Sequence, residues 1–401
     1  MRKKRRIRQR FRIIIALVIG AILGTLVSGG YYFYANSFLL KEVDEAVPMH
    51  YKRERREYSF DLFMVGDALI HSTVYQDAKK SDGSYDFKPM IDLIKPISSS
   101  YDFAYYNQET ILGGSSIPYS NYPRFNSPQE VGDAFIDAGF DLVSLATNHT
   151  MDKGEQGALN SRTYWKDKEK YKVYTAGSWD SFEDREKVRI YRKNNINYAF
   201  FSYTMHTNGL NTPYGKEYLN DVYSDEKAKA DIEKVKDKAD VIIVAMHWGT
   251  EYSLGVNSAQ TRVANYLSSL GVNLIIGAHP HVVEPVEYIN DGKTFVIYSL
   301  GNILSSQIGI EKLTGLMMGV TVKKVVEADG TSHVSIVDPR ADLTYTRYSN
   351  GRNFKVFPYS QLNDSILPNY QSYYNKYKTV VSSRYPELQW GITGAWLYGN
   401  Y

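Results

Sequence analysis

An α/β fold preceded by one membrane helix is predicted by three features of this 401-residue sequence. Between about residues 58 and 304, short apolar runs of strand length alternate with amphipathic stretches of helix length. Hydrophobic residues make up 43% of the chain, which is enough to bury a sizeable core. An uncharged apolar segment precedes this region and is long enough to cross a bilayer.

The N-terminus carries a strong charge asymmetry. Eight of the 47 basic residues lie in the first twelve positions, and no acidic residue occurs before Glu42. The remaining 39 basic and 44 acidic side chains give the rest of the chain a net charge of −5, which argues against a nucleic-acid-binding body. We expect residues 1–12 to stay in the cytoplasm, residues 13–35 to form a signal anchor in the cell membrane, and the body to be extracellular. The alternative is a cleaved signal peptide with its apolar region at residues 13–27, which would export the body equally.

Residues 36–57 are polar and lack an apolar period, so we expect a stalk before a body that spans residues 58–340. Its strands are predicted at residues 58–66, 101–107, 140–146, 171–177, 196–203, 240–247, 272–279 and 294–302. Its helices are predicted at residues 128–138, 156–168, 225–238 and 258–270. Two more strands, at 313–325 and 331–343, flank a turn at 328–330. The last 61 residues hold ten of the 35 tyrosines and are interpreted as a C-terminal extension, residues 341–401.

The chain has no cysteine, which excludes a disulfide framework and thiolate chemistry. Any metal site must therefore use carboxylate, imidazole and amide ligands.

Polar clusters follow five of the predicted strands. They are VGDALIH (Asp67, His71), YNQET (Asn107, Glu109), ATNHTMD (Asn148, His149, Asp152), AMHWGTEY (His247, Glu251) and GAHPHVVEP (His279, His281). Ligands of open α/β sheets bind outside the carboxyl ends of strands, where these clusters would converge. Oxygen ligands mixed with imidazoles are typical of hydrolytic sites that hold Mn, Fe or Zn, often as a pair of ions.

Taken singly, most of these residues have structural alternatives. Asp67 has the position of a helix cap, and Asn148 that of a turn residue. The remaining histidines, His50, His206 and His333, are assigned no function because nothing around them suggests a site. Five such clusters at five strand ends favour a metal site over coincidence.

Together with Ser299-Leu300-Gly301-Asn302, these motifs resemble the bacterial CapA family of capsule-synthesis proteins, the poly-γ-glutamate capsule group. The resemblance covers about residues 58–304. This family is in turn similar to calcineurin-like metallophosphoesterases, which implies a four-layer αββα sandwich with a two-metal site at the strand ends.

The resemblance also implies roles for single residues. Asp67, Glu109 and His281 would hold a first ion, and Glu109, Asn148, His247 and His279 a second. His149 would be the general acid, and Glu251 would orient His247 or a substrate. Asn107 and Arg124 are candidate substrate-binding residues, with a plain surface or structural role as the alternative for Arg124.

Two positions depart from the metallophosphoesterase pattern. His71, a candidate ligand of the first ion, stands four positions after Asp67 instead of two. The bridging carboxylate is Glu109 instead of aspartate. The number of ions, one or two, therefore stays open.

These features predict a membrane-anchored, extracellular, metal-dependent hydrolase or transferase. It would act in the synthesis, release or export of a capsule or cell-wall polymer resembling poly-γ-glutamate. The alternative is a non-catalytic, polymer-binding scaffold of a synthase or export complex. The expected partners are the cytoplasmic membrane, an extracellular anionic polymer and synthase or export subunits, without nucleic acid.

Overall fold

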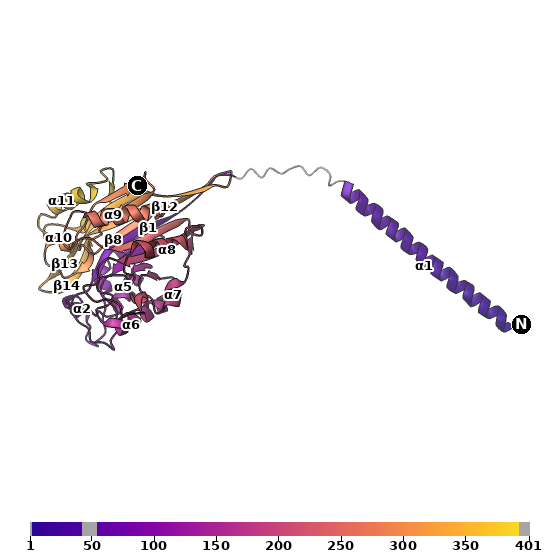
Figure 1. Cartoon of the computed structure of the whole chain (residues 1–401), viewed down its shortest axis with the longest axis horizontal. Coiled ribbons are helices and arrows are strands. Elements are labelled where there is room, and N and C mark those ends of the chain that lie inside the picture. The colour runs from indigo at the N-terminus through magenta and orange to yellow at the C-terminus, as the bar shows by residue number, and fades with distance from the viewer. Residues whose placement is uncertain (1, 42–53, 393–401) are drawn as a thin grey trace. The chain divides into compact units, whose positions relative to one another are not determined.

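The computed structural model describes residues 2–41 and 54–392, which belong to two units divided after Glu54 (Figure 1). The first unit contains one helix, α1 (Arg2–Lys41). Its segment Arg12–Gly30 has a mean hydropathy of 2.4 and is long and apolar enough to cross a membrane, a property that signal sequences share. Most of the predicted stalk, residues 42–53 with His50, lies outside the described residues, as do residues 393–401.

The second unit contains two β-sheets. The strands of the larger sheet are β1 (Arg56–Leu69), β2 (Phe103–Gln108), β3 (Leu142–Ser144), β4 (Tyr174–Ala176), β11 (Asn302–Ser305), β12 (Thr314–Val326), β13 (Ser332–Ser349), β14 (Arg352–Pro358) and β15 (Gln389–Trp390). They run in the order β14-β13-β12-β1-β2-β3-β4, with β11 beside β1 and β15 beside β13. The strands of the smaller sheet are β5 (Tyr191–Lys193), β6 (Ile196–Thr204), β7 (Val241–His247), β8 (Leu274–Ala278), β9 (Val286–Ile289) and β10 (Thr294–Ile297), in the order β5-β6-β7-β8-β10-β9.

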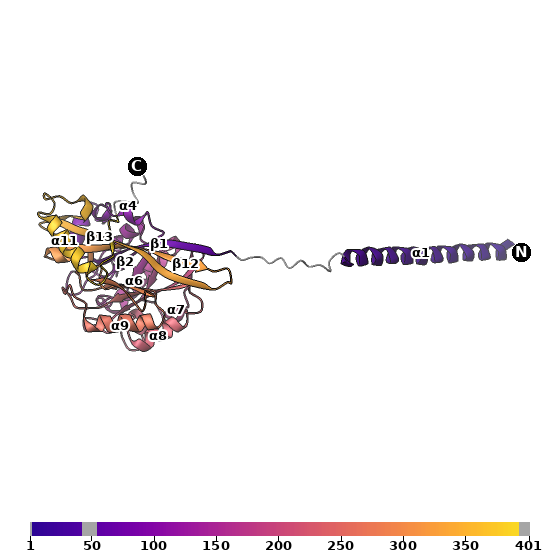
Figure 2. The ribbon, with the colours of Figure 1, turned by 90° about the horizontal axis from the view of Figure 1, so that it is seen from above.

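Helices pack against both sheets. They are α2 (Ser72–Ala78), α3 (Lys88–Ile91), α4 (Lys95–Ser98), α5 (Glu130–Asp137), α6 (Gly154–Lys168), α7 (Phe182–Glu186), α8 (Asp225–Glu233), α9 (Ser258–Ser269), α10 (Ile310–Leu313) and α11 (Tyr370–Ser382). Side-chain caps set where three of them begin. The Ser181 hydroxyl accepts from the Asp184 amide before α7 and the Ser224 hydroxyl from the Lys227 amide before α8, while Asn257 and Gln260 form a capping box on α9. In Figure 2, α8 and α9 lie together on one face of this unit.

Alternating side chains of the central strands build the layers. On β1, Leu62 and Met64 point into the core between the sheets, whereas Phe63 packs into a second core with α2 to α6. On β7, Ile243 points into the shared core, whereas Val244 packs into a third core with α8 and α9. The order of layers is therefore helix, sheet, sheet, helix, which confirms the predicted four-layer α/β sandwich.

One predicted strand and one predicted boundary differ from the structure. Residues 294–302 form two strands that belong to different sheets, β10 and β11, because the chain turns at Gly301, whose φ is +63°. The boundary expected between residues 340 and 341 falls inside β13. Residues after it continue the same sheet through β14 and β15, and α11 buries Tyr377 in the core between the sheets.

The parallel strands of both sheets end at one edge. Strands β1 to β4 are parallel in the larger sheet, and β6, β7, β8 and β10 are parallel in the smaller one. The loops that follow them contain the predicted polar clusters, so this edge positions the candidate site.

A close backbone contact joins β1 to the segment between the sheets. A Cβ atom on Gly66 would lie 1.8 Å from the carbonyl oxygen of Gly301. The next residue, Asp67, donates its amide N–H to that same oxygen at 2.9 Å. A side chain at position 66 would therefore push apart the segments that carry Asp67 and Asn302.

We expect Gly66→Ala to lower the free energy of unfolding by about 3 kcal/mol, because the added methyl group has no space beside Gly301. Urea unfolding of the purified full-length protein, followed by tryptophan fluorescence, measures this change. Gly255→Ala is the matched control, since the nearest atom to its added Cβ is 4.0 Å away. Equal midpoints for the two variants would contradict the steric argument.

Candidate metal centre

Two carboxylates and three imidazoles meet at the shared edge of the two sheets. Asp67 lies near the end of β1 and Glu109 directly after β2, both from the larger sheet. His247 ends β7, whereas His279 and His281 follow β8. All five side chains are at most 5% exposed.

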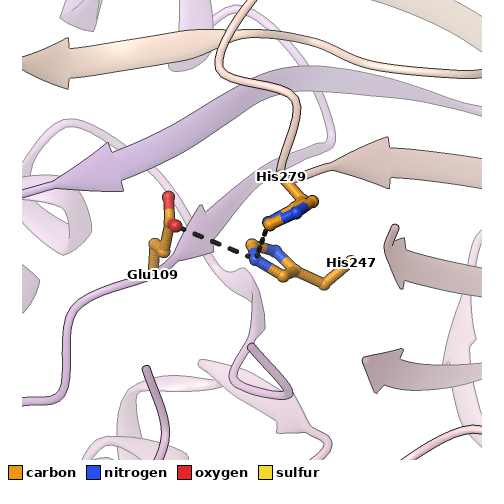
Figure 3. A group of neighbouring side chains, drawn as sticks. All are labelled: Glu109, His247 and His279. Carbon is orange, nitrogen blue, oxygen red and sulfur yellow. Dashed lines mark hydrogen bonds and ion pairs between the residues drawn. The ribbon is translucent and has the colours of Figure 1, made fainter. Parts of the chain in front are cut away.

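These side chains form two groups that share Glu109. One contains Glu109, His247 and His279, as Figure 3 shows, and the other contains Asp67, Glu109 and His281. Within each group the candidate ligand atoms all lie within 4.8 Å of one another. Glu109 Oε1 is 3.6 Å from His281 Nε2 and 3.8 Å from His247 Nε2, too far for hydrogen bonds. Two ligand atoms that each lie about 2.1 Å from the same ion would be about as far from each other as these side-chain atoms are.

Glu109 shows why these residues fit a cation. Both of its carboxylate oxygens are buried and have no hydrogen-bond partner among the described residues. Burial raises the pKa of Glu109 well above its ordinary value. An isolated buried carboxylate is costly unless a positive charge compensates it, so the donor set matches a divalent ion.

The imidazoles differ in charge. Burial lowers the pKa of His247 and His279 well below the ordinary value, so both rings are neutral and have a lone pair for a ligand bond. Burial also disfavours charge on His281, but Glu109 and Asp67 outweigh it and raise the pKa of His281 to about 9.

The turn after β8 is held in an unusual conformation. His279 and His281 have φ values of +98° and +62°, in the region that residues other than glycine rarely adopt. The amide of His279 donates to Asp67 Oδ2 at 3.2 Å, and the carbonyl of Pro280 accepts from the Tyr252 amide at 2.8 Å. These contacts bring two imidazoles from one short segment to the same centre.

Asparagines hold several of these side chains in place. Asn107 Nδ2 donates to Asp67 Oδ1 at 2.8 Å, and Asn148 Oδ1 lies 2.9 Å from His247 Nε2. His281 Nδ1 donates to Asn302 Oδ1 at 3.0 Å, which directs Nε2 toward Glu109. Asn107 is 1% exposed and contacts the candidate ligands. It is not among the residues that line the adjoining cavity. This contact of Asn302 with His281 was not predicted from the sequence, although Asn302 ends the Ser-Leu-Gly-Asn motif.

His149 lies beside the centre and pairs with Asp152. His149 Nδ1 donates to Asp152 Oδ2 at 2.8 Å, and the same oxygen accepts the Phe125 amide N–H at 2.6 Å. The His149 ring also packs edge-to-face on the Phe125 ring, with 4.8 Å between centroids. With Nδ1 fixed by Asp152, Nε2 is the ring nitrogen available to a ligand. Asp152 belongs to the polar cluster ATNHTMD, but no role was predicted for it from the sequence.

A cavity of about 530 Å³ opens next to the centre. It is lined by Leu69, His71, Tyr122, Pro123, Arg124, Phe125, His149, Asn208, Leu210, Glu251, Tyr252, His281 and Gln307. His71 lies in this wall and belongs to neither carboxylate–imidazole group. Its Nδ1 is 3.0 Å from the Leu69 carbonyl, and burial lowers its pKa to about 4.

His206, to which the sequence assigned no function, lies against the centre. Its ring stacks on that of His279, with 4.7 Å between centroids and 26° between the planes. Its position two residues after β6 could have predicted that it lies near the centre, because β6 is parallel to β7 and ends at the same edge.

Comparisons with known proteins identify the family that the chain matches. Residues 61–307, more than half of the chain, match the family model "Bacterial capsule synthesis protein PGA_cap". The PGA biosynthesis protein CapA of Bacillus subtilis is 32% identical over 271 residues, covering 63% of this chain and 66% of that protein. The capsule biosynthesis protein CapA of Bacillus anthracis is 25% identical over 266 residues, covering 64% and 62%. The chain thus spans slightly less than two thirds of the length of these relatives.

The fold is also similar to that of the calcineurin-like phosphoesterase YfkN from Bacillus subtilis. The TM-score is 0.40 at 15% identity, covering 70% of this chain and 91% of that one. The match of the family model across both halves of the candidate centre confirms the resemblance found in the motifs: the chain belongs to the family of bacterial capsule synthesis proteins, PGA_cap.

Proposed function

We propose that this protein is a membrane-anchored, extracellular, metal-dependent hydrolase of an acidic capsule polymer resembling poly-γ-glutamate. The observation that carries the proposal is Glu109, a buried carboxylate that has no hydrogen bonds among the described residues and is shared by two groups of candidate ligands. The family and the names of the two CapA relatives support the capsule polymer as substrate.

The ligand sets follow from the two groups. Asp67, Glu109 and His281 would hold one divalent ion, and Glu109, His247 and His279 with Asn148 would hold another. When bound, such ions lower the pKa of a water molecule and neutralise charge on the oxygen atoms of the scissile group. His71 belongs to neither group, and we keep it as a residue of the cavity wall.

His149 has the surroundings of a general acid. Asp152 accepts a hydrogen bond from Nδ1, which leaves Nε2 as the ring nitrogen that could donate a proton to the leaving atom. Glu251 lines the same cavity, which supports the second of its two predicted roles, orienting the substrate. The leaving atom is an amide nitrogen in a γ-glutamyl polymer and an ester oxygen in a phosphodiester.

A second candidate function is a non-catalytic, polymer-binding scaffold. The observation that favours it is another cavity of about 530 Å³, which is remote in sequence from the histidine clusters. It is lined by Asp342, Tyr359, Ser360, Tyr370, Gln371, Tyr374, Asn375 and Gly391. Aromatic surface of this kind favours contact with a polymer or a protein partner, such as a synthase or export subunit.

We expect His247→Ala to reduce the bound metal from about two ions per chain to about one, because it removes a ligand of one group only. Mass-spectrometric metal analysis of the purified full-length protein measures this loss. His333→Ala is the control, since His333 is an exposed histidine on β13. Equal metal content in both variants would refute the ligand assignment.

We expect His149→Ala to slow hydrolysis by about 10²- to 10⁴-fold while the metal content stays at the wild-type level. The loss should be largest for alkyl phosphodiesters or γ-glutamyl peptides and smaller for p-nitrophenyl esters, whose leaving group needs no proton. Steady-state rates on each pair of substrates test this dependence. A uniform loss on all substrates would argue against a general acid, and absence of turnover in the wild type would favour the scaffold.

We expect a C-terminal epitope tag to be removed by protease added to intact cells, whereas an N-terminal tag stays protected. The basic residues before Arg12–Gly30 should hold the N-terminus inside, and Western blots of both tags measure the outcome. A mature chain that has lost the N-terminal tag would indicate a cleaved signal peptide. A protected C-terminal tag would contradict export of the body.

A further inference from the structure

The loop before α5 brings a cation to the cavity beside the metal centre. Arg124 is the one lysine or arginine among the described residues that line this cavity. Its side chain is exposed, and its guanidinium has no hydrogen bond or ion pair among the described residues. Two other arginines on the surface of the same unit are paired, Arg262 with Asp225 and Arg384 with Glu287, each at 2.8 Å.

The loop that carries Arg124 is firmly held. Ser120 and Asn126 exchange two backbone hydrogen bonds across its base, and the Ser120 hydroxyl donates to the Arg124 carbonyl at 2.7 Å. The fully buried Asn126 side chain donates to the Ile117 carbonyl and accepts from the Gly113 amide. The backbone under Arg124 is therefore positioned before any ligand arrives.

The same loop is bound to the proposed acid. Phe125, the neighbour of Arg124, donates its amide to Asp152 and packs its ring on His149. Phe125 also packs edge-to-face on His71, with 5.3 Å between centroids. The position of Arg124 is therefore coupled directly to that of the His149–Asp152 pair, where the leaving group would lie.

Another part of the cavity wall carries the opposite charge. It contains Glu251 and Tyr252, and the ammonium group of Lys312 lies above the Tyr252 ring, 4.8 Å from its centroid. That lysine has an acidic partner, because its Nζ is 3.8 Å from Glu311. An acidic chain in the cavity would be repelled from Glu251 and attracted to Arg124.

We propose that Arg124 is a specificity residue that binds the free carboxylate of a polymer unit next to the scissile bond. This inference rests on the proposed function, in which the substrate is a chain of γ-glutamyl units with one free carboxylate each. A guanidinium presents two parallel donors that match a carboxylate. A cavity of about 530 Å³ has room for the unit at the metal centre and for a neighbour.

The test uses the full chain in neutral detergent and a fluorescent ten-residue oligo-γ-glutamate, in the His149→Ala background so that turnover is not needed. Arg124→Gln should weaken binding by about tenfold, as expected for loss of a charged hydrogen bond. Arg124→Lys should recover part of the affinity. Arg192→Gln is the matched control, because Arg192 lies on the edge strand β5 and outside the cavity.

An oligomer with amidated side carboxylates should bind weakly, and with the same affinity to the parent protein and to the Arg124→Gln variant. Equal affinity of these two proteins for the acidic oligomer would overturn the inference, as would absence of binding in the parent protein. Arg124-dependent binding of a glycerol-phosphate oligomer in preference to the acidic peptide would overturn the carboxylate assignment. Hydrolysis and metal content are measured separately, so Arg124-dependent binding without turnover in the protein that retains His149 would instead refute the hydrolase and leave a polymer-binding subsite.

Discussion

The burial of two carboxylates at the junction of two sheets is the constraint on which the rest of the site depends. Asp67 and Glu109 are 0% and 1% exposed, so bulk solvent would not screen a negative charge on either side chain. Asp67 has an amide donor in Asn107, whereas Glu109 has no donor among the described residues. An arrangement of this kind costs stability unless a cation balances it. The neutral imidazoles of His247 and His279 suit a site for such a cation, because they offer lone pairs to it without adding positive charge.

The second constraint is that the candidate ligands come from different sheets. The carboxylates follow β1 and β2 of the larger sheet, whereas the imidazoles follow β7 and β8 of the smaller one. The distances between the carboxylates and the imidazoles therefore depend on how the two sheets are joined. The chain crosses from β10 to β11 beside Gly66, where only a residue without Cβ allows the backbones to approach. Asn302, which orients His281, lies directly after this crossing.

The sequence predicted the elements better than it predicted their contacts. Apolar runs indicated the strands, and their polar ends indicated the centre, because strand direction alone places these residues at one edge. The division of residues 294–302 between two sheets could not be predicted, since both parts have the same apolar pattern. The contacts of His206 with His279 and of Asp152 with His149 depend on how loops pack, which local periodicity does not record.

The chain after Arg12 has a net charge of −5, which at first sight disfavours an acidic polymer. At physiological ionic strength, however, charges more than about 8 Å apart are largely screened. Attraction of the proposed polymer would therefore be decided inside the cavity, where Arg124 and the candidate metal groups would face it at short range. Under the proposed function, a weakly repulsive surface would disfavour binding of an acidic chain elsewhere, so that the chain would be held where its bonds reach His149.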